Sequence, residues 1–277
     1  MCSSSRQEFS VLMSVYWKDS PVFLAQSLQS LQSQSWPATE IVLIKDGPLG
    51  SALEVVIAEY AEELPMTCIS LSDNQGLGVA LKLGIEKCNF DLIARMDADD
   101  IAVEHRFERQ IQFMVAHPEI DVLGSSIAEF DVNPHEYTST RSLPIRHEQL
   151  LNFASWRSPM NHMTVMYRKN KVLSAGSYSS VAGLEDYDLW VRMLMDGARF
   201  HNIDEVLVLA RKGNGMQARR GGLGYASREL ALLSSFRKQG FLSMGQMSIR
   251  AVVRILPRLM PSKWRAILYE RFLRTKY

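Results

Sequence analysis

The first 130 residues alternate short apolar segments, rich in β-branched residues, with segments of helical spacing, and this alternation constrains the fold most strongly. Such alternation, with polar turns between the segments, is typical of βαβ units that build a mostly parallel sheet. We therefore expect an α/β fold with an open sheet. The pattern predicts strands at about 9–16, 40–45, 67–71, 92–96 and 121–127.

The pattern changes twice after residue 130. Between 134 and 211 it is less regular, although these residues are still expected to complete the same domain. Later residues lose the strand pattern and keep helical spacing, with breaks expected at Gly240 and Gly245. We predict a main domain at 1–221 and a helical tail at 222–277. Within the less regular region, we expect a helix at 148–156, a strand at 163–167 and a helix at 185–195.

Charge and cysteine content exclude several classes of protein. The 31 Lys and Arg residues nearly balance the 30 Asp and Glu residues, so the chain offers no basic field for nucleic acid. Cys2, Cys68 and Cys88 are too scattered for a disulfide framework or structural zinc, which favours a reducing compartment. The sequence has no apolar signal segment and no run of about 20 apolar residues, so we expect a cytoplasmic protein.

The tail carries an unusual concentration of positive charge. Residues 248–277 contain eight basic residues and one acid, Glu270, and apolar residues are interleaved with them. A cationic amphipathic helix with this composition can lie on an anionic lipid leaflet. The same apolar stripe could instead pack on the main domain or on a second subunit. The sequence leaves both interpretations open, and with them the formation of a homo-oligomer.

Three carboxylates follow the predicted strand at 92–96. Asp97, Asp99 and Asp100 come directly after an apolar run, and the carboxyl end of a strand in an open parallel sheet faces the ligand crevice. Carboxylates at such an edge can hold a hard divalent cation that also binds substrate phosphates. A solvated acidic turn explains the same residues. Gly76 and Gly78 do not complete a dinucleotide fingerprint, and the sequence contains no P-loop.

Several blocks, taken in order, resemble the family 2 glycosyltransferases of the GT-A fold, the inverting type that builds bacterial surface polysaccharides. The resemblance extends over roughly residues 9–212, and the joint order is more specific than any single block. It implies a GT-A catalytic domain with a donor half at about 9–130 and an acceptor half at about 131–221. The blocks are Ser14-Val15-Tyr16, the segment 40–47, the segment 74–84, Met96-Asp97-Ala98-Asp99-Asp100 and the segment 183–190.

The resemblance assigns roles on the donor side. Asp97 and Asp99 match the Asp-x-Asp motif, in which the first acid lies near the ribose and the last binds Mn²⁺ or Mg²⁺ on the nucleotide diphosphate. Asp46 resembles one acid of a pair that contacts uracil. Lys45 stands at the other position of that pair, so the sequence departs from the family at the residues that contact the base.

Two further segments are candidates for contact with the nucleotide. Asn74 and Gly76 belong to a turn that resembles the family's loop beside the nucleotide, although a helix N-cap with a glycine entry explains them equally well. Arg219 and Arg220 would suit a basic loop over the diphosphate, because arginine forks match phosphate oxygens. An exposed hinge before the tail is the alternative for this pair.

The acceptor side is expected around the segment 183–190. Asp186 resembles the family's catalytic base, which must take the proton of the attacking hydroxyl. Glu185 and Asp188 lie on the same first turn, where the helix dipole favours acids in any case. Trp190 is expected beside the acceptor sugar or in the core. His162 is expected near the acceptor or the metal, or as a structural residue.

Together these features predict an inverting, metal-dependent hexosyltransferase. We expect it to use a nucleotide-diphospho-sugar, with UDP favoured, and to extend a lipid-linked oligosaccharide from the inner face of the plasma membrane. Two alternatives remain at this point. One is a sugar nucleotidyltransferase, which would need a Gly-rich basic loop after the first strand, where Tyr16, Trp17 and Lys18 stand instead. The other is a catalytically silent, membrane-associated scaffold.

Overall fold

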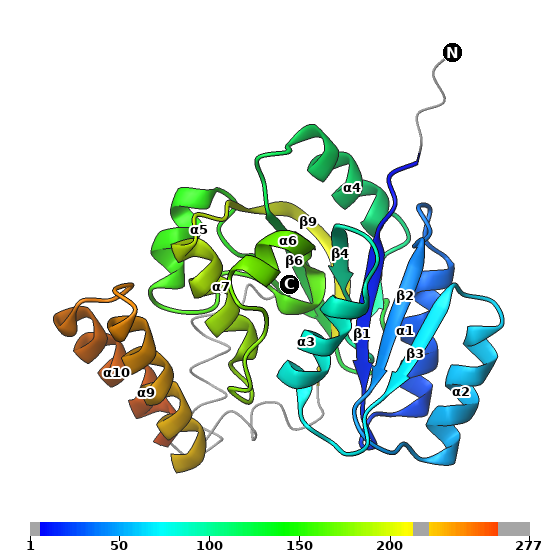
Figure 1. The fold of residues 1–277 in the computed structure, drawn as a ribbon, viewed down its shortest axis with the longest axis horizontal. Coiled ribbons are helices and arrows are strands. Elements are labelled where there is room, and N and C mark those ends of the chain that lie inside the picture. Colours follow the sequence, from blue (N-terminus) through cyan, green and yellow to red (C-terminus); the bar gives the residue numbers. More distant parts are fainter. Residues whose placement is uncertain (1–5, 213–221, 260–277) are drawn as a thin grey trace.

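The computed structural model describes residues 6–212 and 222–259, in which nine strands form one sheet with helices on both faces (Figure 1). The strand order is β3-β2-β1-β4-β8-β6-β9-β5, and β7 pairs with β6. Strands β1 to β4 are parallel to one another, and β6 is parallel to β9, whereas β8 runs antiparallel to its neighbours β4 and β6. The predicted α/β fold with a mostly parallel open sheet is confirmed.

The elements follow the chain in the order that the alternation predicts. The strands are β1 (Ser10–Val15), β2 (Glu40–Lys45), β3 (Met66–Ser70), β4 (Leu92–Arg95), β5 (Ile101–Ala102), β6 (Val122–Phe130), β7 (Tyr137–Arg141), β8 (Met166–Arg168) and β9 (Phe200–Arg211). The helices are α1 (Pro21–Gln32), α2 (Ser51–Ala61), α3 (Leu77–Lys87), α4 (Arg106–Ala116), α5 (His147–Ala154), α6 (Lys169–Ser174), α7 (Glu185–Met195), α9 (Leu223–Lys238) and α10 (Met244–Leu259), with a 3₁₀ turn, η1 (His162–Thr164).

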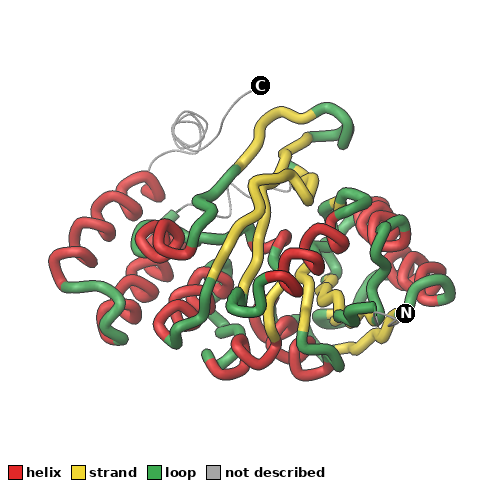
Figure 2. The backbone as a smooth tube through the Cα atoms, turned by 90° about the horizontal axis from the view of Figure 1, so that it is seen from above, coloured by secondary structure: helices red, strands yellow, loops and turns green. Residues whose placement is uncertain are grey.

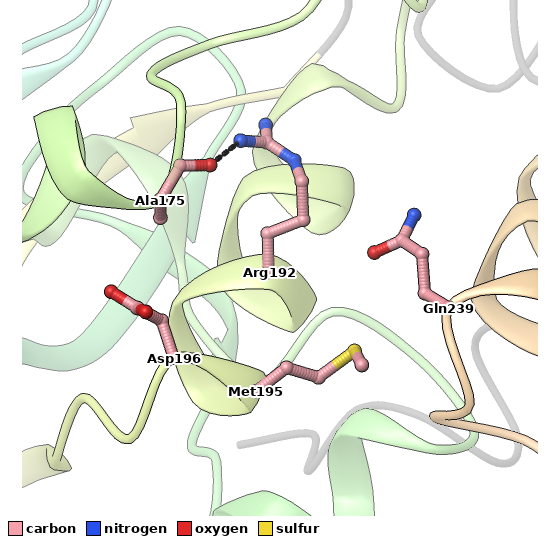
Figure 3. A pocket seen from close by; sticks show the side chains of 5 residues that line it. All are labelled: Ala175, Arg192, Met195, Asp196 and Gln239. Atoms are coloured by element: carbon pink, nitrogen blue, oxygen red, sulfur yellow. Dashed lines mark hydrogen bonds between the residues drawn. The ribbon is translucent and has the colours of Figure 1, made fainter.

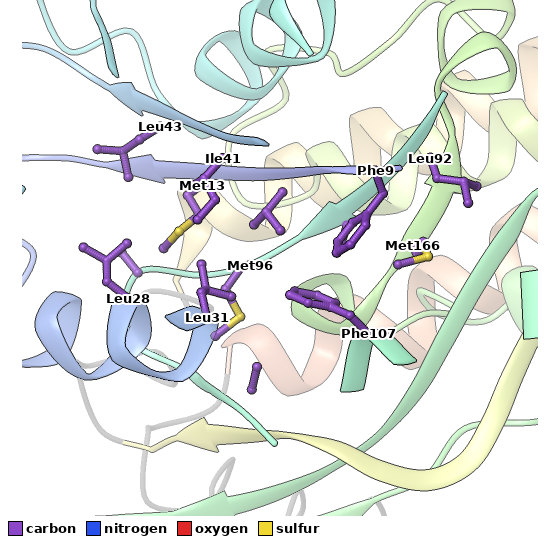
Figure 4. Close-up of a cluster of buried hydrophobic side chains, with 14 of the residues drawn as sticks. Phe9, Met13, Leu28, Leu31, Ile41, Leu43, Leu92, Met96, Phe107 and Met166 are labelled. Atoms are coloured by element: carbon purple, nitrogen blue, oxygen red, sulfur yellow. The ribbon is translucent and has the colours of Figure 1, made fainter. Parts of the chain in front are cut away.

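The sheet separates two hydrophobic layers. Along β1, Val11 and Met13 point into the layer that contains α1, α2 and α4, whereas Leu12 points into the layer that contains α3 and α7. This alternation follows from the two-residue period of a strand, and because both faces are covered, β1 reads as a continuous apolar run. Figure 4 shows the first layer, and Figure 2 shows the helices on both sides of the strands.

All five predicted strands in the first 130 residues are present, with ends that differ by up to three residues. The predicted helix at 185–195 is α7, and the predicted helix at 148–156 corresponds to α5. The strand expected at 163–167 is partly wrong. Met163 and Thr164 belong to η1, because the backbone N–H of Thr164 bonds to the carbonyl of Asn161 (2.9 Å), and β8 begins only at Met166.

Strand β9 is the main element that the sequence pattern did not predict. Its first half contains His201, Asn202, Asp204 and Glu205, so the apolar alternation of a buried strand is absent there. Its pairing with β6 also shifts register at Ser125 and Ser126. Tertiary pairing therefore decides the conformation of this segment, and it carries the chain back to the edge of the sheet that holds Asp97.

The tail begins with two packed helices. Helix α9 contacts α7 through a cluster that includes Tyr187, Val191, Leu232 and Phe236, and α10 packs on α9. Both views place this pair at the end of the molecule away from β3 and α2 (Figures 1 and 2). The break expected at Gly240 is present, but the one expected at Gly245 is wrong, because Gly245 is the second residue of α10 and continues its helix.

Within residues 6–212 and 222–259, none of the helices combines the length and the apolar composition needed to cross a bilayer.

Candidate active site

The acidic turn after β4 lies at the carboxyl edge of the parallel strands. The side chains of Asp97 and Asp99 are partly exposed at this edge, whereas Asp100 is buried. Two hydrogen bonds hold the turn in place. The Ser27 hydroxyl on α1 donates to the carbonyl of Asp97 (2.9 Å), and the backbone N–H of Arg211 donates to Oδ1 of Asp100 (2.9 Å). The two exposed acids are thus presented together at the end of the sheet.

Two buried arginines lie beneath the acidic turn. Arg95 is almost fully buried, and its Nη2 forms an ion pair with Oδ1 of Asp97. Arg106 is completely buried and donates to the carbonyl of Arg95 (2.7 Å) and to Gln110 Oε1 (3.1 Å). Burial, assisted by the charge of Arg95, lowers the pKa of Arg106 to about 9. These cations offset the charge of three adjacent carboxylates.

Asp100 differs in chemistry from its two neighbours. Burial, and then the charges of Asp97 and Asp99, raise the pKa of Asp100 well above its ordinary range. Its Oδ1 accepts the backbone N–H of Arg211. Asp100 therefore serves to tie β9 to the turn, while Asp97 and Asp99 remain accessible.

The Asp46 carboxylate holds the turn that contains Asn74 and Gly76. It accepts hydrogen bonds from the backbone N–H groups of Gln75 (2.7 Å) and Gly76 (3.0 Å) and from the Asn74 side-chain amide (2.9 Å). Gly76 has φ +90°, a conformation that favours glycine, and it precedes the first residue of α3. The three residues therefore form a helix entry that Asp46 stabilises. Lys45, at the departure from the family pattern, pairs with Glu54 (2.5 Å).

Helix α7 presents Asp186 and Glu185 at its N-terminus. Asp186 is partly exposed, and the Ser158 hydroxyl donates to its Oδ2 (3.2 Å). Glu185 is buried, and its Oε2 has no hydrogen-bond partner within the described part of the chain. Burial and then the charge of Asp186 raise the pKa of Glu185. The helix start thus combines one accessible carboxylate with one that burial shifts toward its neutral form.

His162 lies between the acidic turn and α7. Its Nε2 is 2.8 Å from the Tyr178 hydroxyl. Burial, and then the charge of Arg95, lower the pKa of His162, while the nearby charges of Asp186 and Asp97 oppose this shift. The imidazole of His162 thus lies within electrostatic range of both carboxylates, which are almost 90 positions apart in the sequence.

Trp190 is a core residue. Its side chain is completely buried, with its ring centroid 5.9 Å from that of Phe200 and 6.1 Å from that of His162. The expectation that Trp190 packs beside an acceptor sugar is therefore wrong for this structure, and the core interpretation is correct. Asp188 is likewise structural, because Arg192 pairs with its Oδ2 at 2.9 Å and also donates to the carbonyl of Ser177.

The sequence comparisons identify the family of the chain. The family model described as glycosyl transferase family 2 matches residues 10–180. The chain belongs to glycosyltransferase family 2. An amylovoran biosynthesis glycosyltransferase, AmsE of Erwinia amylovora, is 40% identical over 95% of this chain and 98% of its own length. A UDP-Gal:α-D-GlcNAc-diphosphoundecaprenol β-1,3-galactosyltransferase of Escherichia coli is 35% identical over 98% of each chain.

Solved structures show the same fold at low identity. The structure of S. aureus TarS 1–349 in complex with UDP-GlcNAc superposes on this chain with a TM-score of 0.67 at 18% sequence identity. The match covers 91% of this chain and 72% of the TarS chain. The match to a longer TarS chain covers 43% of the length of that chain. A mannosyltransferase of Pyrobaculum calidifontis in complex with GDP-Man and Mn²⁺ gives a TM-score of 0.61 at 14% identity over 95% of this chain and 84% of its own. The GT-A-like α/β fold is therefore confirmed, and membership of the family overturns the nucleotidyltransferase alternative.

The residues at the acidic turn fit a divalent cation that is shared with a substrate. The described residues contain no group of three or more His, Cys, Asp or Glu side chains that could enclose a metal ion. Mg²⁺ and similar hard cations are commonly held by one or two carboxylates together with substrate phosphates and water. Asp99 and Asp97 match that smaller set. His162 fits less well as a ligand, because its Nε2 contacts Tyr178.

Arg211 of this glycosyltransferase also lies at the acidic turn, although the sequence motifs did not predict it. It is the last residue of β9, its Nε donates to the carbonyl of Asp99 (3.2 Å), and its guanidinium carbon lies 3.9 Å from the ring centroid of Phe23 and 4.5 Å from that of Phe130. No motif surrounds Arg211, so only the return of β9 to this edge could have revealed it. Arg219 and Arg220 lie outside the described residues.

A surface hollow lies at the opposite end of α7 from Asp186. Figure 3 shows the residues that line it, which come from α7, the segment after α6 and the end of α9. Arg192 is directed into this region and donates to the carbonyl of Ala175. The hollow contains none of the candidate site residues, so it is separate from the acidic turn.

Gly78 is required where α3 meets α7. A Cβ added there would lie 2.1 Å from the carbonyl oxygen of Ser179 and 3.4 Å from Cβ of Glu185. Gly78→Ala should therefore lower the free energy of unfolding by about 2 kcal/mol, because a backbone group must move. Chemical denaturation followed by circular dichroism measures this change.

Gly224→Ala is the matched control. Gly224 is also the second residue of a helix, α9, but nothing lies within 4 Å of a Cβ added to it. This substitution should leave stability unchanged or raise it by about 0.5 kcal/mol, because alanine restricts the unfolded chain more than glycine does. Equal effects at Gly78 and Gly224 would contradict the packing argument.

Proposed function

We propose that this glycosyltransferase transfers a hexose, with inversion, from a UDP-sugar to a hydroxyl of a lipid-linked oligosaccharide in bacterial surface polysaccharide biosynthesis. The observation that carries the proposal is that the charges of Asp97 and Asp186 both act on His162, with Asp99 partly exposed on the same acidic turn as Asp97. The names of two full-length relatives support the pathway class and a diphosphate-lipid acceptor. The UDP-GlcNAc complex of a protein with the same fold supports a nucleotide-sugar donor.

Asp186 is proposed as the catalytic base. In an inverting transfer the acceptor hydroxyl attacks the anomeric carbon from the face opposite the leaving nucleotide diphosphate, and its proton passes to a carboxylate. The Ser158 hydroxyl orients the Asp186 carboxylate by donating to one of its oxygens, which leaves the other oxygen available. Glu185 and His162 complete the acceptor side, where burial favours the uncharged form of each.

Asp99, together with Asp97, is proposed to hold Mn²⁺ or Mg²⁺ on the donor diphosphate. When bound, such a cation acts as a Lewis acid that stabilises the charge of the leaving diphosphate. The chain's own contribution is to keep two carboxylates exposed at one edge, with Arg95 and Arg211 fixing the turn. Arg219 and Arg220 remain proposed contacts for the diphosphate.

Asp46 is proposed to act on the nucleotide through the turn that it holds. Both of its carboxylate oxygens accept hydrogen bonds from the turn at 74–76. The position of Asn74 and Gly76 beside a bound nucleotide would then depend on Asp46. The proposed site of action is the cytoplasmic face of the plasma membrane, where the acceptor lipid would be presented.

Calorimetric titration with UDP tests the donor side before any acceptor is known. UDP should bind at least about tenfold more tightly with Mn²⁺ than with a chelator, because the cation links the carboxylates to the diphosphate. GDP serves as the comparison nucleotide and should bind more weakly. Failure of both nucleotides to bind in the presence of Mn²⁺ would favour the catalytically silent scaffold, and tighter binding of GDP would overturn the choice of UDP.

A further inference from the structure

Helix α10 directs basic side chains toward the protein. Arg250 is nearly buried, and it donates to the carbonyl (2.6 Å) and the hydroxyl (2.8 Å) of Ser155. One turn later, Arg254 pairs with the buried carboxylate of Glu229 and donates to the carbonyl of Trp156 (3.1 Å). The cationic side chains that would ordinarily face water therefore attach this helix to α9 and to the end of α5.

The opposite face of α10 is apolar and exposed. Ile249, Val252, Val253 and Leu256, called here the α10 stripe, are each between 53% and 58% exposed. Their spacing of three and four residues places them along one side of the helix. A continuous apolar stripe on a surface helix marks a contact with a partner, since single exposed apolar residues would be scattered. The helix is thus amphipathic with its apolar side facing outward.

The sequence that follows the stripe indicates which partner fits. Residues 258–277 contain six basic residues and a single acid, Glu270. Two copies of such a segment would repel each other, whereas an anionic lipid surface would attract it, by about 1 kcal/mol for each basic residue near the surface. We propose that the α10 stripe docks on an anionic lipid leaflet and that the basic segment after it strengthens this contact.

The proposal that the α10 stripe docks on lipid rests on the proposed function, because a lipid-linked acceptor requires the enzyme to work at a membrane. The anchor of α10 and the candidate base share one support. Ser155, which binds Arg250, is three residues before Ser158, which donates to Asp186. The Tyr187 hydroxyl donates to the carbonyl of Ala154 (2.6 Å) in the same segment. Docking through the stripe would therefore hold the Asp186 end of α7 at a fixed place relative to the lipid.

Vesicle flotation of the full-length protein tests the proposal. Wild type should float with phosphatidylglycerol vesicles, and the double variant Val252→Glu with Leu256→Glu should lose at least about tenfold in vesicle partitioning, because it replaces apolar contacts with like charge. Val55→Glu with Val115→Glu is the matched control. These two residues are 56% and 58% exposed on α2 and α4, and the control should float like wild type.

Three results would overturn the proposal. Wild type would fail to float with phosphatidylglycerol vesicles, the α10 variant would float as well as wild type, or the control would lose as much binding as the α10 variant. Sedimentation of the same proteins without lipid identifies a second copy as the occupant instead, if wild type is a dimer and the α10 variant is a monomer.

A cysteine at the stripe separates lipid docking from coverage by the chain itself. In a Cys2→Ser, Cys68→Ser background, Val253→Cys should react with a hydrophilic maleimide in solution and become protected on addition of phosphatidylglycerol vesicles. Cys88 can remain, because it is buried and burial raises the pKa of its thiol to about 12, so it carries little thiolate. Protection of a monomer without vesicles would instead assign the stripe to the protein's own C-terminal segment.

Failure of this inference can be told from failure of the proposed function. The UDP titration with Mn²⁺ is repeated on the α10 variant, which should bind UDP as wild type does. Normal UDP binding combined with unchanged flotation would overturn only the membrane surface. Loss of UDP binding in wild type would overturn the proposed function, whatever the vesicles show.

Discussion

Asp186→Asn should reduce the rate of sugar transfer by about a thousandfold, the range expected when a positioned general base is removed. The amide cannot take the proton of the acceptor hydroxyl at neutral pH, but it keeps the size of the carboxylate and can still accept the Ser158 hydrogen bond through its oxygen. UDP binding with Mn²⁺ should therefore stay within about twofold of wild type. Steady-state transfer with a diphosphate-lipid acceptor, together with calorimetry, measures both quantities.

Asp196→Asn is the matched control for this prediction. Asp196 is the residue after the last turn of the same helix, and its Oδ2 also accepts a serine hydroxyl, that of Ser174 (2.8 Å). It should transfer sugar at the wild-type rate. If Asp186→Asn kept normal transfer in a folded protein, or if both variants lost activity equally, Asp186 would not be the base.

Asp99→Ala should lower kcat/KM by at least about a hundredfold and remove most of the Mn²⁺ dependence of UDP binding. A cation that stabilises a leaving diphosphate contributes several kcal/mol, and Asp99 is the partly exposed carboxylate proposed as its main protein ligand. The fold should persist, because Asp99 reaches Arg211 through its backbone carbonyl, which the substitution keeps. Titration of activity with Mn²⁺, together with thermal unfolding, checks both statements.

Asp91→Ala provides the control at the other end of the same strand. Asp91 directly precedes β4, its side chain is 54% exposed, and its nearest cation, Arg168, is 3.9 Å away. This variant should keep both activity and metal dependence. An Asp99→Ala enzyme that bound UDP with the wild-type response to Mn²⁺ would show that the cation, if one is used, is held elsewhere.

The donor half could be predicted well from the sequence because its signals are local. Its central strands β1, β2 and β4 are buried on both faces and read as apolar runs, and residues such as Asp46 and Gly47 after β2 break the run. The limits of α7 at Glu185 and Met195 were also correct, since acids begin the helix and a polar turn ends it. Predictions of secondary structure were therefore correct where local sequence signals determine it.

The remaining features depend on contacts between distant parts of the chain. Trp190 has the same helical spacing whether it faces a ligand or the core, and only the packing of Phe200 from β9 decides. Arg211 contacts Asp99 across 112 positions, a relation that no local pattern contains. Asp46 was expected beside the nucleotide, yet its hydrogen bonds run to a turn 28 to 30 residues away. The directions of these side chains therefore could be determined only from the structure.

A long segment of the chain begins and ends at the acidic turn. The backbone leaves the turn after Asp100 and returns to it at Arg211, where the two residues are joined by a hydrogen bond. The 110 residues between them include most of the acceptor half expected at about 131–221. Because both ends of this long segment are held at one point, loops within it can lengthen, shorten or be exchanged between homologues. Asp97 and Asp99 would stay in place while these loops change. In the proposed function, the choice of acceptor could thus change in evolution while the site proposed for the donor stays constant.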